Sequence, residues 1–107
     1  MEIDKEHMAE LRRTYPDAKE YTEGGLLYIH FPKFALPSGG VVEALLLLNG
    51  ANPYTTRFFL PNQVVGKGPN WTEHQILNKK WWTWSWKDIP GDIRYMEILS
   101  NHLRALR

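Results

Sequence analysis

The segment Val41 to Leu48 (VVEALLLL) constrains the fold of this chain more than any other. It is almost continuously apolar, and it lies between two turn sequences, Gly39-Gly40 and Asn49-Gly50. Alanine and leucine favour a helix, but a run this short between such turns is typical of a strand. A strand that is apolar on both faces must be covered on both, so the sequence predicts a central strand in a sheet.

A β hairpin is predicted before this strand. Ala18 to Thr22 and Leu26 to Phe34 are joined by Glu23-Gly24-Gly25, whose glycines can adopt the positive φ angles of a tight turn. Large side chains fall on both faces of the second run, so we expect it to lie centrally as well. Arg57 to Leu60 (RFFL) predicts a brief fourth strand, which Pro61-Asn62 ends.

Helices are predicted near both ends of the chain. Ile3 to Thr14 can begin with Asp4 as its N-cap and stop at Tyr15-Pro16. The last helix has the clearest periodic pattern, and Pro90 and Asp92 are expected at its start. The positions that share its core-facing stripe are Tyr95, Ile98, Leu99, His102, Leu103 and Leu106. Such a stripe is typical of a helix packed on a sheet.

Composition narrows the class of protein. The 107 residues are 43% hydrophobic, enough for one domain over residues 1–107 with a single core. The formal net charge of +1 comes from 13 basic and 12 acidic residues mixed along the chain, so neither nucleic acid nor an anionic membrane is an expected partner. The absence of cysteine excludes disulfides and thiolate metal sites, and no apolar run is long enough for a membrane span or signal peptide. We therefore expect a cytoplasmic protein.

The tryptophans are concentrated in one segment. Four of the five fall within six residues, at Trp81, Trp82, Trp84 and Trp86. In an extended segment, alternation places the last three on one side, under the final helix, and Trp81 on the other. We therefore expect Trp81 and the separate Trp71 to be exposed. Both are candidates for a partner-binding surface, with Lys79 and Lys80 beside them.

The predicted order is a helix, a four-stranded antiparallel meander, a long irregular stretch from Gln63 to Lys80, the tryptophan segment and a helix packed on the sheet. This order defines an α+β fold. Two segments resemble ubiquitin-conjugating enzymes (E2 proteins). Tyr54 to Asn62 (YTTRFFLPN) is similar to the passage that ends in their His-Pro-Asn motif. Trp84 to Pro90 (WSWKDIP) resembles the Trp-Ser-Pro sequence that leads into their next helix.

A narrower resemblance follows from the short chain, the turn Leu36 to Gly39 and the WWTWSW run. These features are similar to small prokaryotic E2-like proteins encoded beside E1-like enzymes and tandem ubiquitin-like proteins. The resemblance spans about Tyr15 to Leu106 and implies a ubiquitin-conjugating-enzyme-like fold.

The resemblance fails at the chemistry of the active site. It implies a thioester on a cysteine that belongs in the window Asn70 to Asn78 (NWTEHQILN), where Thr72 is the only hydroxyl. An unactivated threonine is a poor nucleophile. The motif histidine is replaced by Leu60, which leaves Pro61 and Asn62 as a remnant of the motif. We expect Asn62 to hold its own loop, since there is no thioester to attack.

Two histidines are further candidates. His102 lies on the stripe of the last helix, where a core histidine bonded to a nearby carbonyl is the favoured interpretation. His74 is either a solvated loop residue or the remnant of a site. The four histidines have no metal-ligand spacing, so neither a metal nor a cofactor is expected.

These observations favour a binding protein over an enzyme. We expect a non-catalytic E2-like adaptor that binds a ubiquitin-like protein, an E1-like activating enzyme, or both, in a prokaryotic conjugation system. One alternative is a true E2 enzyme whose cysteine in the window Asn70 to Asn78 has been substituted, by engineering or by divergence. Another is a small module that binds a peptide or carbohydrate through exposed tryptophans, Trp71 or Trp81.

Overall fold

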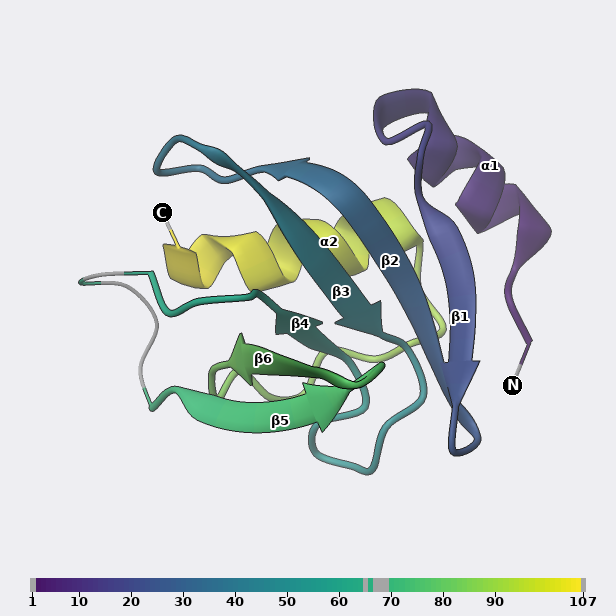
Figure 1. Ribbon diagram of the computed structural model, residues 1–107. Helices are drawn as coiled ribbons and strands as arrows, with labels where there is room; N and C mark the ends of the chain where they lie inside the picture. Colours follow the sequence, from purple (N-terminus) through teal and green to yellow (C-terminus); the bar gives the residue numbers. More distant parts are fainter. Residues whose placement is uncertain (1, 65, 67–69, 107) are drawn as a thin grey trace.

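The computed structural model describes residues 2–64, 66 and 70–106. Its elements are α1 (Lys5–Thr14), β1 (Lys19–Glu23), β2 (Leu26–Ala35), β3 (Val41–Leu47), β4 (Arg57–Phe59), β5 (Thr72–Ile76), β6 (Lys79–Thr83), α2 (Tyr95–Leu103) and the 3-10 turn η1 (Arg104–Leu106). Strands β1 to β4 form an antiparallel sheet in chain order, and β5 pairs with β6 in a separate two-stranded sheet. Figure 1 shows α2 crossing behind the larger sheet and the β5–β6 hairpin lying next to β4.

The four-stranded meander with a helix at each end confirms the predicted α+β fold. The central position of β2 and β3 is also confirmed. The β1–β2 hairpin turns through Gly24 and Gly25, whose φ angles of 57° and 78° are in the left-handed region that glycine adopts without strain.

The two faces of the larger sheet are covered by different elements. We call the face that packs against both helices the inner face. Its buried cluster joins alternate strand residues such as Leu46 and Phe58 to Met8 of α1 and Ile98 of α2. The opposite, outer face carries a smaller cluster, which consists of Tyr28, Leu45, Leu47, Phe59, Ile76 and Trp81. Ile76 and Trp81 belong to the β5–β6 hairpin, so the hairpin covers this face.

The prediction of an irregular stretch from Gln63 to Lys80 is wrong for its second half, because Thr72–Ile76 and Lys79–Thr83 form a hairpin. Its turn places Leu77 and Asn78 at positive φ angles, 56° and 58°. Ile76 is the one fully buried residue of β5, so the strand lacks the apolar alternation that reveals a half-buried strand. Residues 65 and 67–69 of the predicted stretch lie outside the described residues.

The ends of the helices are partly as predicted. The Asp4 carboxylate accepts a hydrogen bond from the backbone N–H of His7 at 2.9 Å, which confirms the N-cap of α1. Helix α2 instead begins at Tyr95, with Arg94 at its N-cap position, so the placement of Pro90 and Asp92 at its start is wrong. The reason lies upstream, where the Thr56 hydroxyl donates to the Ile89 carbonyl at 2.9 Å and holds this segment as a loop.

Candidate functional site

The motif residues Pro61 and Asn62 follow β4 and line a narrow groove of about 190 Å³. The lining residues are Leu36, Val42, Leu60, Pro61, Asn62, Gln63 and Val64. Leu60 and Trp82 exchange two backbone hydrogen bonds, of 2.8 and 2.7 Å, which fix one wall of the groove against β6. Aliphatic side chains dominate this lining, and the amides of Asn62 and Gln63 are its polar side chains. The groove can therefore hold a peptide segment, and its lining contains no nucleophile among the described residues.

Asn62 does not hold its loop in the way that the sequence analysis expected. The residue is exposed, and its side chain makes no hydrogen bond to another residue in the described part of the chain. Its amide is therefore free of intramolecular partners within the described residues and can bond a ligand.

His74 lies on strand β5 and not in a loop. Its Nε2 accepts hydrogen bonds from Arg57 Nη1 at 3.3 Å and from the Thr72 hydroxyl at 3.2 Å. Burial lowers the pKa of His74, and the positive charge of Arg57 lowers it further, so the ring is neutral at pH 7. A histidine whose basicity is lowered takes up a proton poorly. The Thr72 hydroxyl is within hydrogen-bond distance of His74, but the lowered pKa makes His74 a weak base for activating that hydroxyl.

Arg57 is the member of this cluster that the sequence analysis missed. Its guanidinium lies 4.1 Å above the ring of Tyr54, and its Nε is buried without a hydrogen-bond partner among the described residues. No carboxylate in the described part of the chain forms an ion pair with it. Burial also lowers the pKa of Arg57. No sequence pattern indicates this half-buried cation, since Arg57 is one of 13 basic residues in a mixed-charge chain.

The two predicted partner-binding lysines both have acidic neighbours. Lys79 forms an ion pair with Glu43 and lies 4.8 Å above the ring of Trp81. The second Glu43 carboxylate oxygen is 2.6 Å from His30 Nε2. Burial and the charges of nearby lysines lower the pKa of His30, so the neutral ring donates its Nε2–H to Glu43. Lys80 Nζ lies 3.8 Å from a carboxylate oxygen of Glu73, where both side chains are largely exposed.

The expected exposure of Trp81 is wrong. Trp81 is only 1% exposed, because β6 turns it toward the outer face of the larger sheet, and its indole N–H donates to the Ile76 carbonyl at 3.0 Å. Trp71 is half-buried, with its ring centroid 5.2 Å from that of Trp84. Trp84 and Trp86 join the inner cluster with α2, as predicted, but Trp82, which was expected with them, belongs to neither buried cluster. The burial of Trp81 leaves Trp71 as the remaining tryptophan of the predicted surface.

His102 is a core residue, as the sequence analysis favoured, but its partner is different. It is 1% exposed, and its Nε2 lies 2.8 Å from the hydroxyl of Thr56. Since that hydroxyl donates to Ile89, it accepts the His102 Nε2–H, and the partner is not a carbonyl. Burial lowers the pKa of His102 to about 4, with a further contribution from Arg57.

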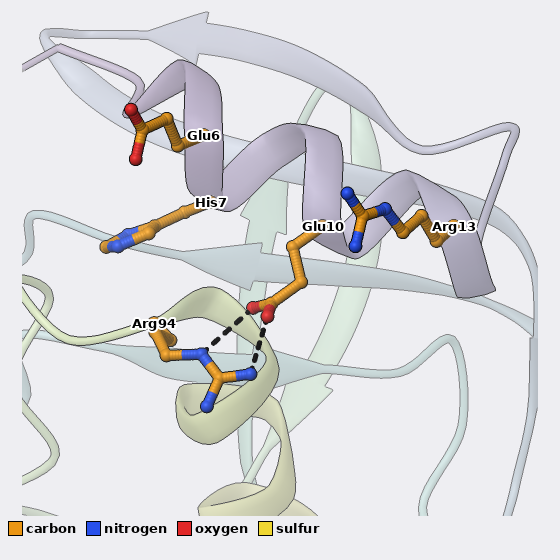
Figure 2. Close-up of a pocket in the computed structure, with 5 residues that line it drawn as sticks. All are labelled: Glu6, His7, Glu10, Arg13 and Arg94. Atoms are coloured by element: carbon orange, nitrogen blue, oxygen red, sulfur yellow. Dashed lines mark hydrogen bonds and ion pairs between the residues drawn. The ribbon is translucent and has the colours of Figure 1, made fainter.

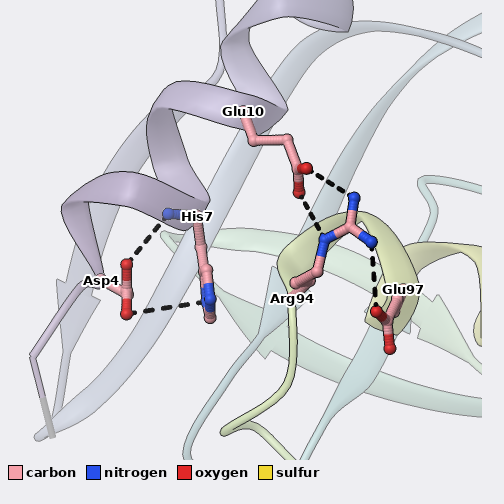
Figure 3. Close-up of polar contacts among 5 residues, drawn as sticks. All are labelled: Asp4, His7, Glu10, Arg94 and Glu97. Atoms are coloured by element: carbon pink, nitrogen blue, oxygen red, sulfur yellow. Dashed lines mark hydrogen bonds and ion pairs between the residues drawn. The ribbon is translucent and has the colours of Figure 1, made fainter.

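A larger groove, of about 340 Å³, lies between α1 and the start of α2. Figure 2 shows its lining residues Glu6, His7, Glu10, Arg13 and Arg94. The Glu10 carboxylate accepts hydrogen bonds from Arg94 Nε at 3.1 Å and from Arg94 Nη2 at 2.5 Å, and this pairing lowers the pKa of Glu10. Figure 3 shows that Arg94 also donates to Glu97. The charges of Glu10 and Arg94 at the centre of the groove are thus paired with each other. Such a pair is typical of a contact between two helices.

No group of three or more potential metal ligands occurs within the described residues. Among the same residues, the helices are all too short or too polar to cross a membrane. Comparisons with protein-family models, with curated proteins and with solved structures found no match. What this chain shows is therefore an α+β fold with a meander sheet, and the E2 resemblance remains a prediction from the sequence.

Proposed function

We propose that this chain is a non-catalytic E2-like adaptor that binds a ubiquitin-like protein or its E1-like enzyme. The observation that supports the proposal best is the groove at Pro61 and Asn62. It lies directly after β4, where the E2 resemblance places the remnant of the His-Pro-Asn motif, and its described lining residues have no hydroxyl, thiol or amine to form an acyl bond.

The chemistry of the groove suits an extended peptide tail. Leu36, Val42 and Val64 offer apolar contacts, and the amides of Asn62 and Gln63 can bond a peptide backbone. The volume of about 190 Å³ is smaller than a typical small-molecule pocket, roughly 300–1,000 Å³. A short segment of a larger partner therefore fits better than a free metabolite. The chain terminus of a ubiquitin-like protein is the segment that the resemblance implies.

Titration calorimetry with the ubiquitin-like and E1-like proteins encoded beside this chain tests the binding. We expect binding at micromolar concentrations. In NMR spectra of this chain, we expect the amide chemical shifts of Asn62 and Val64 to change when the partner is added. Val64→Arg places a charge in the groove and is expected to weaken binding by about tenfold or more, roughly 1.4 kcal/mol. Val41→Arg is the matched control, because Val41 is 67% exposed and does not line the groove. No binding of either protein, or equal weakening by both variants, contradicts the adaptor proposal.

A second experiment tests the absence of catalysis. The chain is incubated with its E1-like enzyme and the activated ubiquitin-like protein, and covalent adducts are sought by mass spectrometry. We expect no adduct in the window Asn70 to Asn78, because Thr72 is its only hydroxyl and His74 beside it is a weak base. An ester on Thr72, lost in Thr72→Val, would support the alternative of a true conjugating enzyme.

A further inference from the structure

Strand β1 forms an open edge of the larger sheet. It pairs with β2 on one side, in continuous register from Lys19 to Glu23, and no described strand pairs with its other side. All five of its residues are exposed, including Tyr21 at 46%. β1 has neither proline nor a β-bulge, so its protection as an edge strand is limited to its short length and its charged residues Lys19, Glu20 and Glu23.

The backbone groups that face this open edge can be identified from the neighbouring strands. The Leu27 carbonyl accepts from Leu48 N at 2.9 Å, and the Leu27 N–H donates to the Asn49 side chain at 2.6 Å, so the backbone groups of Leu27 point away from β1. Thr22, which is opposite Leu27, therefore directs its own N–H and carbonyl away from β2. Glu20 does the same two residues earlier.

We propose that β1 pairs with β1 of a second copy of this chain, antiparallel and about a two-fold axis at Tyr21. The sequence Lys19–Glu23 (KEYTE) is complementary to itself in this register alone. Lys19 lies opposite Glu23 of the second copy, Glu20 lies opposite Thr22, and Tyr21 lies opposite Tyr21. A parallel, in-register pairing would instead place lysine beside lysine and glutamate beside glutamate, which is unfavourable.

The bonds available at this interface match the groups at the edge. Glu20 of one copy and Thr22 of the other form the hydrogen-bonded pairs of the new ladder, and each such pair exchanges two backbone hydrogen bonds. Lys19, Tyr21 and Glu23 share the outer face with Tyr28, so the charged pairs and the tyrosine pair form there. The Glu23 carboxylate is already positioned, since it accepts from Leu77 N at 3.0 Å.

Helix α1 lies near the start of β1, and all five residues of β1 that this register uses remain exposed. Figure 1 shows α1 beside the end at which β1 begins. There the Arg12 guanidinium donates to the Ala18 carbonyl at 3.0 Å, so the open ladder starts after Ala18. The two-fold axis places the two α1 helices at opposite ends of the paired strands. One strand pair is a small interface compared with the roughly 1,200–2,000 Å² of stable complexes, so the dimer dissociates on dilution.

The absence of cysteine from the chain permits a direct test. Tyr21→Cys places a single thiol at the two-fold axis, in a non-hydrogen-bonded pair whose Cα atoms are about 4.5 Å apart, within disulfide range. Under mild oxidation we expect a disulfide-linked dimer to form about tenfold faster or more than with Val41→Cys, because pairing raises the local thiol concentration. Val41 is more exposed than Tyr21, at 67%, and lies on β3 away from this edge.

Sedimentation equilibrium of the unmodified chain supplies the second measurement. We expect a concentration-dependent dimer that Lys19→Glu weakens, since this change places two glutamates opposite each other, and that Lys33→Glu on β2 leaves unchanged. Val41→Cys oxidising as fast as Tyr21→Cys overturns the proposal. A dimer that Lys19→Glu does not weaken also overturns it, because the copies then associate through another surface.

Discussion

The inner and outer faces of the β1–β4 sheet are built from alternate residues of the same strands, but they are covered in different ways. Two amphipathic helices close the inner face over a large apolar cluster. A two-stranded hairpin covers the outer face over a small cluster, beside the charged contacts of Lys79 with Glu43 and Arg57 with His74. The comparison indicates that the inner face supplies most of the stability. The outer face carries charged and polar contacts at the margin of its smaller cluster.

The largest expected difference comes from two adjacent leucines on β3. Leu46 faces inward and Leu45 outward, and both are fully buried. We expect Leu46→Ala to lower the free energy of unfolding by about 4 kcal/mol, and Leu45→Ala by about 2–3 kcal/mol, because a short hairpin can shift into the space more readily than packed helices. Urea denaturation measures both values. Equal losses would contradict the difference between the faces.

The second prediction concerns pH and the inner side of the molecule. The pKa of His102 is about 4 when folded and near 6.5 when unfolded. Above pH 6.5 neither state binds the proton. As the pH falls from 6.5 to 4, the unfolded chain binds it first, so the free energy of unfolding decreases, by up to about 3 kcal/mol. Urea denaturation across this range should show a weaker pH dependence in His102→Gln. If the free energy of unfolding depends on pH equally in both proteins, His102 is not the cause of that dependence.

A third prediction separates the hairpin from the sheet that it covers. The buried Thr83 hydroxyl donates to the Phe58 carbonyl at 2.7 Å and links β6 to β4. Thr83→Val keeps the shape of the side chain but removes this donor, so we expect a loss of about 1–2 kcal/mol in the free energy of unfolding. Thr72→Val, at an exposed position of the same hairpin, is the control. It should lower the free energy of unfolding by less than Thr83→Val does.

The smallest effect is expected at the charged margin of the outer face. Glu43 contacts Lys79 and His30, but all three side chains are partly exposed to solvent. Glu43→Gln should therefore lower the free energy of unfolding by less than about 1 kcal/mol, and the difference from the unmodified protein should shrink as salt is added. A difference that persists in high salt would show that packing, and not charge, is responsible.

The sequence predicted the parts of this molecule that repeat an apolar period. The stripe of α2, the central strands and the core position of His102 all follow from such periods. The β5–β6 hairpin could not be predicted from such a period. Strand β5 is polar along most of its length, and the turn uses Leu77 and Asn78 in place of glycine. Alternation placed Trp81 on the side away from the final helix, but without that hairpin it could not indicate that Trp81 is buried there.

The candidate site was predictable only in part, for a related reason. Pro61 and Asn62 follow a strand that its own sequence reveals, so their place at the end of β4 was expected. The hydrogen bond between Arg57 and His74 links β4 to β5, and the ion pair between Glu10 and Arg94 links the two helices. Such contacts depend on how the helices and strands pack together. Each involves a single polar residue from each element, and a single residue forms no periodic pattern from which the contact could be predicted.

The hairpin that covers the outer face also has a consequence for motion. Strands β5 and β6 pair mainly with each other, and the backbone hydrogen bonds between Leu60 and Trp82 link them to β4. Such a unit can open without unfolding the rest of the domain. In native-state hydrogen exchange, the amides of β5 and β6 should therefore exchange together and at a lower free energy than those of β2 and β3. Each opening would bring Trp81 into water for a moment while the helices stay closed on the inner face.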